Sequence, residues 1–371
     1  MDNPQHLATI VASAAFVLAL ALGWVASHSH FCTMGALSDV VTMGDRGRLR
    51  MMLLAIAVAM MATNLMVGLG WIDVSKSLYG ADRLLWASHL VGGMLFGVGM
   101  TIASGCGARN LVRLGGGNLK SLVVLMCLGL VAYMTLRGVL APVRVHALEV
   151  WSLDLDRSQL LPRILADASG LSSIHATLLC ATVIAAGILV YVAKDSEFRR
   201  SPQYIAGGVL VGVLVALGWY VTGHIGYLAE DPNTLEEAFV GTNTRRPESF
   251  TFVGPIAYGL ELALLWTDAS LRVTFGIAGV VGVATGALVY AIFKRQFRWE
   301  GFTSASDLRQ HLLGGALMGF GGVCAMGCTI GQGITGLSTL ALGSFITWIG
   351  LATGCVMTIK WMMWRLEAQA A

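Results

Sequence analysis

The sequence predicts an all-α polytopic membrane protein, and three observations support this fold class. Hydrophobic residues make up 56% of the 371 residues and charged residues only 12%, whereas soluble domains carry about 25% charged residues. The hydrophobic residues gather in runs of about 20, the length with which a helix crosses the hydrocarbon core. Two of these runs are rich in glycine and resemble each other. A soluble protein cannot carry so little charge, because its core must still be covered by polar surface.

The first half of the chain is expected to form four spans and one re-entrant turn. The first span covers about 7–27 and ends in the polar patch SHSHFCTMGALSDV. This patch is too polar to face lipid and too short to form a separate domain. We expect it to turn back inside the protein, because irregular backbone is tolerated there and not against lipid. Further spans are expected at about 51–70, 89–106 and 119–140.

The second half is expected to retrace the first after a connector at about 141–202. The connector combines a surface loop with one span at about 173–193. In the second half, FTFVGPIAYG aligns with HFCTMGAL, which places Thr251 where the first half has Cys32. Spans of the second half are expected at about 203–222, 273–293, 311–328 and 345–364.

The two halves share a repeated stretch. HLVGGMLFGVGMTIASGCG begins at His89 and HLLGGALMGFGGVCAMGCT begins at His311, and a shift of 222 residues aligns seven identical His, Gly and Cys residues, among them Cys106 with Cys328. Glycine-interrupted hydrophobic segments in corresponding places of two halves indicate a transport site between repeats. Because the connector adds an odd span, the second half enters the membrane upside down. We therefore predict about nine transmembrane helices plus re-entrant or broken helices, in two inverted repeats of one domain. The domain is 1–371, and the repeats are about 7–140 and 203–364.

The basic residues predict which side of the membrane each end of the chain faces. In the nine-span scheme, four basic clusters fall on one side, which the positive-inside rule assigns to the cytoplasm. These clusters are 46–50, 109–120, 194–200 and 294–298. The N-terminus then faces the periplasm and the C-terminus faces the cytoplasm.

The two broken helices suggest the chemistry of the site. In inverted repeats they meet near the middle of the membrane, so Cys106 and Cys328 are expected to approach each other. The turns GCGARN and GCTIGQG can each begin a short helix, whose N-terminal amides favour an anion. A thiol is a weak donor, so this arrangement suits a soft, sulfur-rich anion and binds it weakly enough to release it.

Three cysteine motifs carry a family resemblance. FCTMGALSD, SGCGARNLVRLGGGNLKSLVV and MGCTIGQGITG resemble those of the YeeE/YedE family of bacterial inner-membrane proteins. The resemblance implies multi-pass insertion in the inner membrane and thiosulfate uptake through an hourglass-like path. It also implies that Cys32, Cys106 and Cys328 line this path and relay the ion by S–H hydrogen bonds, with Cys106 at the constriction. Gln332 stands where we expect histidine in several members of the family.

Four further residues are candidates for secondary roles. Anchoring of the cytoplasmic turn is the interpretation we favour for Arg109, with help in anion exit as the alternative. Thr251 occupies the repeat position of Cys32. Gln332 belongs to the third motif. Cys324 lies four residues before Cys328, so the two would share one face if the helix continued. Packing is the interpretation we favour for Cys324, with a redox pair as the alternative.

The remaining alternatives concern other kinds of protein. A membrane enzyme that handles disulfides or persulfides would be expected to carry a CxxC motif, which is absent. An accessory subunit of a sulfur-oxidising system is a further alternative, and a metal site at His28, His30 and Cys32 is the least favoured. We predict a transporter and not an enzyme, without metal or cofactor. Expected partners are a sulfur anion, membrane lipid and a cytoplasmic sulfurtransferase-type protein; the net charge of +3 is too small to suggest nucleic acid.

Overall fold

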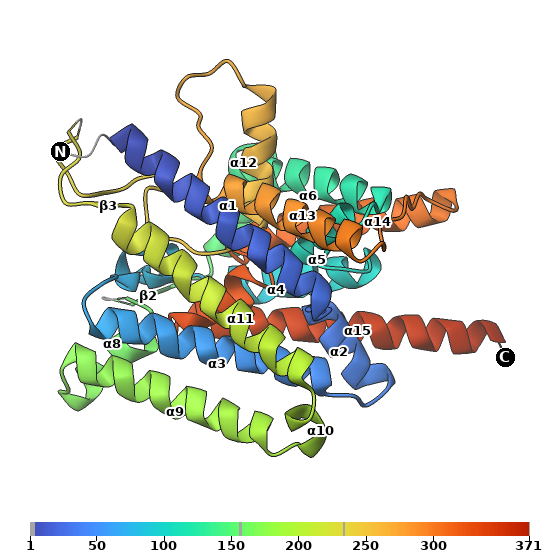
Figure 1. The fold of residues 1–371 in the computed structure, drawn as a ribbon, viewed down its shortest axis with the longest axis horizontal. Coiled ribbons are helices and arrows are strands. Elements are labelled where there is room, and N and C mark those ends of the chain that lie inside the picture. The colour runs from blue at the N-terminus through green and yellow to red at the C-terminus, as the bar shows by residue number, and fades with distance from the viewer. Residues whose placement is uncertain (1–3, 156–157, 233, 371) are drawn as a thin grey trace.

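The computed structural model describes residues 4–155, 158–232 and 234–370. These residues form an elongated bundle of helices whose N-terminal and C-terminal ends lie at opposite ends of the long axis (Figure 1). The long helices run as follows: α1 (Pro4–His28), α3 (Gly47–Gly68), α4 (Trp86–Ile102), α6 (Leu119–Arg137), α9 (Ser173–Ala193), α11 (Pro202–Tyr220), α13 (Phe275–Phe293), α14 (Ala305–Cys324) and α15 (Leu342–Ala370).

Shorter elements connect these helices. The short α-helices are α2 (Thr33–Thr42), α5 (Gly107–Gly115), α7 (Ala141–Val143), α8 (Leu161–Ser169), α10 (Ser196–Arg199) and α12 (Val253–Leu264). The other helical turns are η1 (Val74–Lys76), η2 (Leu78–Gly80), η3 (Arg144–Glu149), η4 (Val221–Ile225) and η5 (Gly331–Gly336). Two antiparallel strand pairs complete the described chain: β1 (Arg83–Leu84) with β2 (Leu153–Asp154), and β3 (Tyr227–Leu228) with β4 (Ala238–Phe239).

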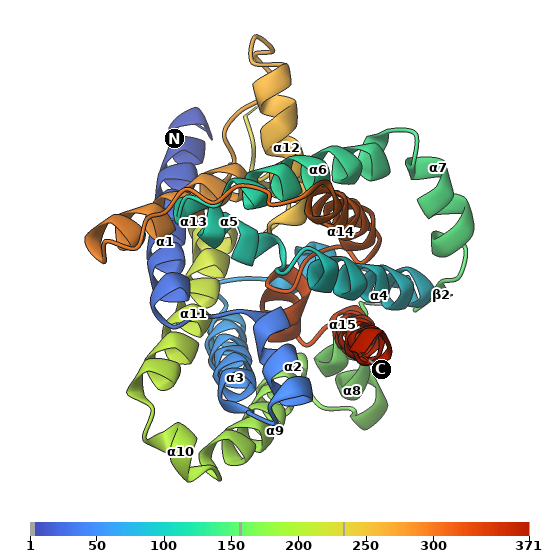
Figure 2. The same ribbon diagram turned by 90° about the vertical axis from the view of Figure 1, so that its right-hand side faces the viewer.

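The helices confirm a multi-pass, all-α membrane protein. Among the described residues, eight helical segments are long and apolar enough to cross a membrane. Each predicted span coincides with one long helix, and the ninth is α14. This helix has 20 residues but is less apolar, because Asp307 and Arg309 lie near its start. In the end-on view, α9 and α10 lie at the edge of the bundle, while α4 and α5 lie near its centre (Figure 2).

The helices of the two halves pack in exchanged pairs. Helix α4 packs along α15, and α14, its counterpart in the second half, packs along α6. Helix α1 packs along α13, and α11 packs along α3. Helices α4 and α14 also cross each other, so the two repeated stretches are in contact as well.

Glycines at the α4–α14 crossing make reciprocal contacts. A Cβ atom on Gly314 would lie 2.7 Å from the backbone oxygen of Gly99, and a Cβ atom on Gly92 would lie 2.8 Å from that of Gly321. A shift of 222 residues converts one contact into the other. In both contacts an early residue of one helix meets a late residue of the other, so the helices are antiparallel. Only glycine permits such an approach of two helix backbones.

Candidate functional site

Cys32, Cys106 and Cys328 follow the same kind of helix break. The helices before them, α1, α4 and α14, each end four residues earlier. At each end, the N–H of the residue preceding the cysteine donates to a carbonyl five residues back. These bonds are Phe31 to Ala26 (3.1 Å), Gly105 to Met100 (2.8 Å) and Gly327 to Gly322 (2.8 Å). Such a bond is typical of a helix C-terminus at which the residue just before the N–H donor has a left-handed backbone conformation.

The left-handed residue occurs two positions before each cysteine. Its φ angle is 53° at His30, 56° at Ser104 and 58° at Met326. None of these three residues is glycine, so each break keeps a backbone conformation that L-residues adopt at a cost of about 1–2 kcal/mol. The polarity of the patch around Cys32 predicts a turn there, but the likeness of this turn to the other two is not visible, because HFC lacks the glycine that precedes the other two cysteines.

Each cysteine also begins the next helical segment. The sulfur of Cys32 accepts the N–H of Gly35 at 3.3 Å, and the sulfur of Cys328 accepts the N–H of Gly331 at 3.3 Å. Cys106 holds the corresponding position before α5, without a side-chain cap hydrogen bond. Cys32 and Cys106 are thus the N-caps of α2 and α5. The free N–H groups and positive dipole ends of these two helices face the thiols, which favours an anion there.

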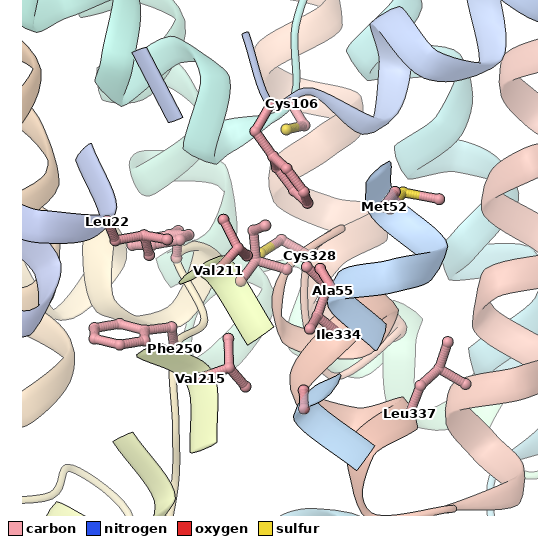
Figure 3. Packing of buried hydrophobic residues seen from close by; sticks show 14 of the residues in the cluster. Leu22, Met52, Ala55, Cys106, Val211, Val215, Phe250, Cys328, Ile334 and Leu337 are labelled. Carbon is pink, nitrogen blue, oxygen red and sulfur yellow. The ribbon is translucent and has the colours of Figure 1, made fainter. Parts of the chain in front are cut away.

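Cys106 lies near both other cysteines, and the Thr329 hydroxyl lies beside its thiol. This hydroxyl is buried and has no conventional hydrogen-bond partner. Cys106 is 2% exposed and Cys328 is fully buried, and Figure 3 shows both in one apolar cluster with Phe250.

A very small cavity lies at this point. Cys32, Cys106 and Arg109 line it together with apolar side chains that include Phe31 and Phe252, and its volume is about 20 Å³. A cavity of this size holds about one water molecule. A polyatomic anion does not fit, so the structure is closed beside Cys106.

A wide cleft adjoins the cavity at the end of the molecule where the C-terminus lies. Its volume is about 510 Å³. It shares Cys32 and Arg109 with the small cavity. We name it the arginine cleft after the four arginines that line it: Arg48, Arg109, Arg113 and Arg298.

The opposite side of the site is closed by hydrogen-bonded aromatic residues. The Tyr79 hydroxyl, from η2, donates to the backbone oxygen of Gly331 at 2.8 Å. The Trp219 indole donates to Ser338 at 3.1 Å and packs edge-on against Tyr79. The hydroxyl of Thr335 donates to the backbone oxygen of Phe250 at 2.8 Å. Cys328 lines neither the small cavity nor the arginine cleft, so the described site is accessible from the cleft side.

Three of the secondary candidates surround the Cys328 loop. The Gln332 amide donates to Ala325 at 2.7 Å and accepts from Ser344 at 2.5 Å, so both of its ends are engaged. Thr251 packs on the same loop, because a Cβ atom on Gly331 would lie 2.4 Å from its hydroxyl. Cys324 is the last residue of α14 and packs against Gly92.

Cys324 and Cys328 do not share a helix face, because the helix does not continue from one to the other. The helix ends at Cys324, and the left-handed Met326 separates the two cysteines. All seven cysteines are free. Within the described part of the chain, no group of three or more His, Cys, Asp or Glu residues is placed to hold a metal ion.

Comparison with known proteins identifies the family. The family described as sulphur transport matches residues 28–357. The chain is similar to the thiosulfate transporter TsuA of Escherichia coli K12, with 24% identity over 364 residues that cover 92% of both chains. It is also similar to the thiosulfate transporter TsuA of Spirochaeta thermophila, with 24% identity over 352 residues that cover 92% of this chain and 96% of the relative. The matched segment contains all three break cysteines, and the chain belongs to the sulphur-transport family, as the resemblance to YeeE/YedE proteins predicted.

Proposed function

We propose that this protein takes up thiosulfate, or a closely related sulfur anion, across the bacterial inner membrane. The main supporting observation is that Cys32, Cys106 and Cys328 are buried and each directly follows a helix break, and that Cys32 and Cys106 line one small cavity. The family and the names of the relatives support a sulfur anion as the substrate. The ion would pass Cys328, Cys106 and Cys32 in turn and leave through the arginine cleft.

Weak, neutral donors suit this passage. The sulfurs of Cys32 and Cys328 each accept a backbone N–H, and all three thiols keep their own S–H for the ion, so no covalent intermediate is needed. An anion that leaves water loses strong hydrogen bonds, and the helix N-termini of α2 and α5 compensate part of that loss. Because the cavity at Cys106 holds about 20 Å³, the helices around it must separate for each ion.

We also propose that the two halves, about 7–140 and 203–364, are inverted repeats. The reciprocal glycine contacts between antiparallel α4 and α14 support this arrangement, because a two-fold axis makes each contact occur twice. The basic clusters that surround the arginine cleft support a cytoplasmic position for that end. The N-terminus would then lie in the periplasm and the C-terminus in the cytoplasm.

The contacts of the four secondary candidates suggest a role for each of them. Arg109 would guide the ion from the thiols into the cleft, since it lines both spaces. Gln332 and Thr251 would position the Cys328 loop, and Cys324 would serve the packing of α14 on α4. A cytoplasmic sulfurtransferase-type protein that accepts the ion at the arginine cleft stays a prediction, as does specific contact with membrane lipid.

The test is uptake of radiolabelled thiosulfate into cells that make the protein. With matched expression, Cys106→Ala and Cys106→Ser are both expected to reduce uptake to the background of cells without it. Cys180→Ala is the control, because Cys180 lies on the peripheral helix α9 and outside the site. Unchanged uptake in both Cys106 variants would contradict the proposal.

The two variants also separate the proposal from its alternatives. If Cys106→Ser transports normally and Cys106→Ala does not, a small polar group is sufficient and the sulfur is not required. Mass spectrometry of the wild-type protein after exposure to thiosulfate tests the enzyme alternative. A stable persulfide on Cys106 would favour that alternative over non-covalent transport.

A further inference from the structure

The arginine cleft carries excess positive charge. Arg48 pairs with Asp39 at 3.2 Å, and Arg113 donates to the backbone oxygen of Ser104 at 3.1 Å. No ion pair engages Arg109 or Arg298 among the described residues, and Arg298 is exposed. The one acidic residue that lines the cleft, Glu300, accepts from the Asn118 amide at 2.5 Å. Guanidinium donors therefore remain available to a ligand.

The position of these arginines is not explained by membrane topology alone. The positive-inside rule requires only basic residues near the membrane surface, and exposed residues such as Arg200 meet it. The cleft arginines come from three separate parts of the chain, namely α3, α5 and the segment after α13, and converge on one hollow. The arginines are not a feature of the repeated sequence either, because the residues that correspond to Arg109 and Arg113 in the second half are Gly331 and Thr335.

The chemistry of the cleft differs from that of the thiol route. Planar guanidinium groups bind oxyanions through two parallel hydrogen bonds, and they recognise charge and geometry. The cleft has a volume of about 510 Å³, which accommodates a small oxyanion together with water. Cys32 is the only cysteine among its lining residues. In the cleft, an anion is therefore recognised mainly by its charge and oxygen atoms and no longer by contacts of its sulfur atom with several thiols.

We propose that the arginine cleft is a second anion site, which binds small tetrahedral dianions such as sulfate from the solution that it faces. A dianion held by Arg109 and Arg298 would cover Cys32. The consequence for transport rests on the proposed function: a bound dianion would occupy the place that the released ion has to pass.

The experiment measures how fast Cys32 is alkylated in the purified full-length protein. N-ethylmaleimide labelling of each cysteine is followed by peptide mass spectrometry, with sodium sulfate compared against sodium chloride at equal, low ionic strength. Sulfate is expected to slow the labelling of Cys32 severalfold. Cys127 lies on α6 outside the cleft and is partly exposed, so its labelling rate should not change.

Charge variants identify the site. Arg298→Gln and Arg109→Gln each remove a charge-assisted donor, so each should raise the sulfate concentration for half-protection by about tenfold. Arg200→Gln is the matched control, with the same change of charge at an exposed position outside the cleft. Equal protection in all four proteins would overturn the proposal, because it would reflect a general effect of the salt.

Equilibrium dialysis with radiolabelled sulfate provides an independent readout. The wild-type protein is expected to bind sulfate, and Arg298→Gln is expected to bind it about tenfold more weakly. Absence of binding by the wild-type protein would overturn the proposal, whatever the labelling rates. Neither assay requires transport, so failure of thiosulfate uptake and failure of sulfate binding are separate results.

Discussion

At the scale of single residues, Cys32 has a structural role beside the chemical role that we propose for it. The sulfur of Cys32 accepts the N–H of Gly35 and thereby caps α2, while its S–H group can donate to a ligand. A serine at the same place would keep the cap, because serine is a preferred N-cap residue. Its hydroxyl is a stronger donor than the thiol, so it would replace a weak contact by a stronger one.

Two substitutions of Cys32 should separate these roles. Cys32→Ala is expected to destabilise the folded protein by about 1 kcal/mol, because the Gly35 N–H loses its acceptor. Cys32→Ser should keep wild-type stability, and both variants should lose thiosulfate uptake. Thermal unfolding in detergent at one fixed heating rate measures stability, and the cell assay measures uptake. An equal loss of stability in both variants would show that the cap is unimportant.

At the scale of elements, the crossing of α4 and α14 determines where the two breaks lie. The glycines at the crossing let two backbones approach until side chains no longer fit between them. The breaks at Cys106 and Cys328 directly follow the ends of these two helices. The position of the thiols relative to each other therefore depends on this helix contact.

Alanine at the crossing should destabilise the protein. A Cβ atom on Gly99 would lie 2.7 Å from the backbone oxygen of Gly314, so Gly99→Ala has to separate the helices. We expect a loss of about 1–3 kcal/mol and reduced uptake. In the matched control, Gly187→Ala on α9, the new Cβ atom meets no atom within 4 Å. This variant should unfold at the wild-type temperature or slightly above it, since alanine favours a helix. The prediction fails if the two variants behave alike.

At the scale of the whole molecule, the site is reached from one end. The arginine cleft opens at the end where the C-terminus lies, while Tyr79 and Trp219 help to close the other side. The structure thus represents a state with the cleft open and the thiols closed off from the opposite side. Uptake requires at least one further state, in which the layer around Tyr79 separates from the Cys328 loop.

Reporter fusions test the proposed orientation. Alkaline phosphatase is active only outside the cytoplasm, so a fusion at the C-terminus should be inactive, whereas a fluorescent protein there should be fluorescent. Phosphatase inserted in the segment between β3 and β4, near Glu236, should be active because this segment lies at the opposite end (Figure 1). An active phosphatase at the C-terminus would reverse the orientation and place the arginine cleft outside.

Local patterns in the chain were sufficient to predict the helices and two of the breaks. Hydrophobic runs determine spans, because each span has to satisfy its backbone hydrogen bonds within itself. The Gly-Cys pairs before Gly107 and Thr329 indicate breaks, because glycine there interrupts an apolar run. The polarity of the patch around Cys32 predicts the break there. Its likeness to the other two breaks cannot be read from the sequence, because no glycine precedes Cys32.

Only the tertiary structure decided what meets at the site. Arg48, Arg109 and Arg298 are far apart in the sequence, and no local pattern predicts that they line one cleft. The width of the cavity at Cys106 depends on how the apolar side chains of several helices pack around it. Similarly, Cys324 and Cys328 seemed to share a helix face until the left-handed residue between them was known. Spans follow from short-range backbone chemistry, whereas cavities and charge clusters follow from contacts between distant segments.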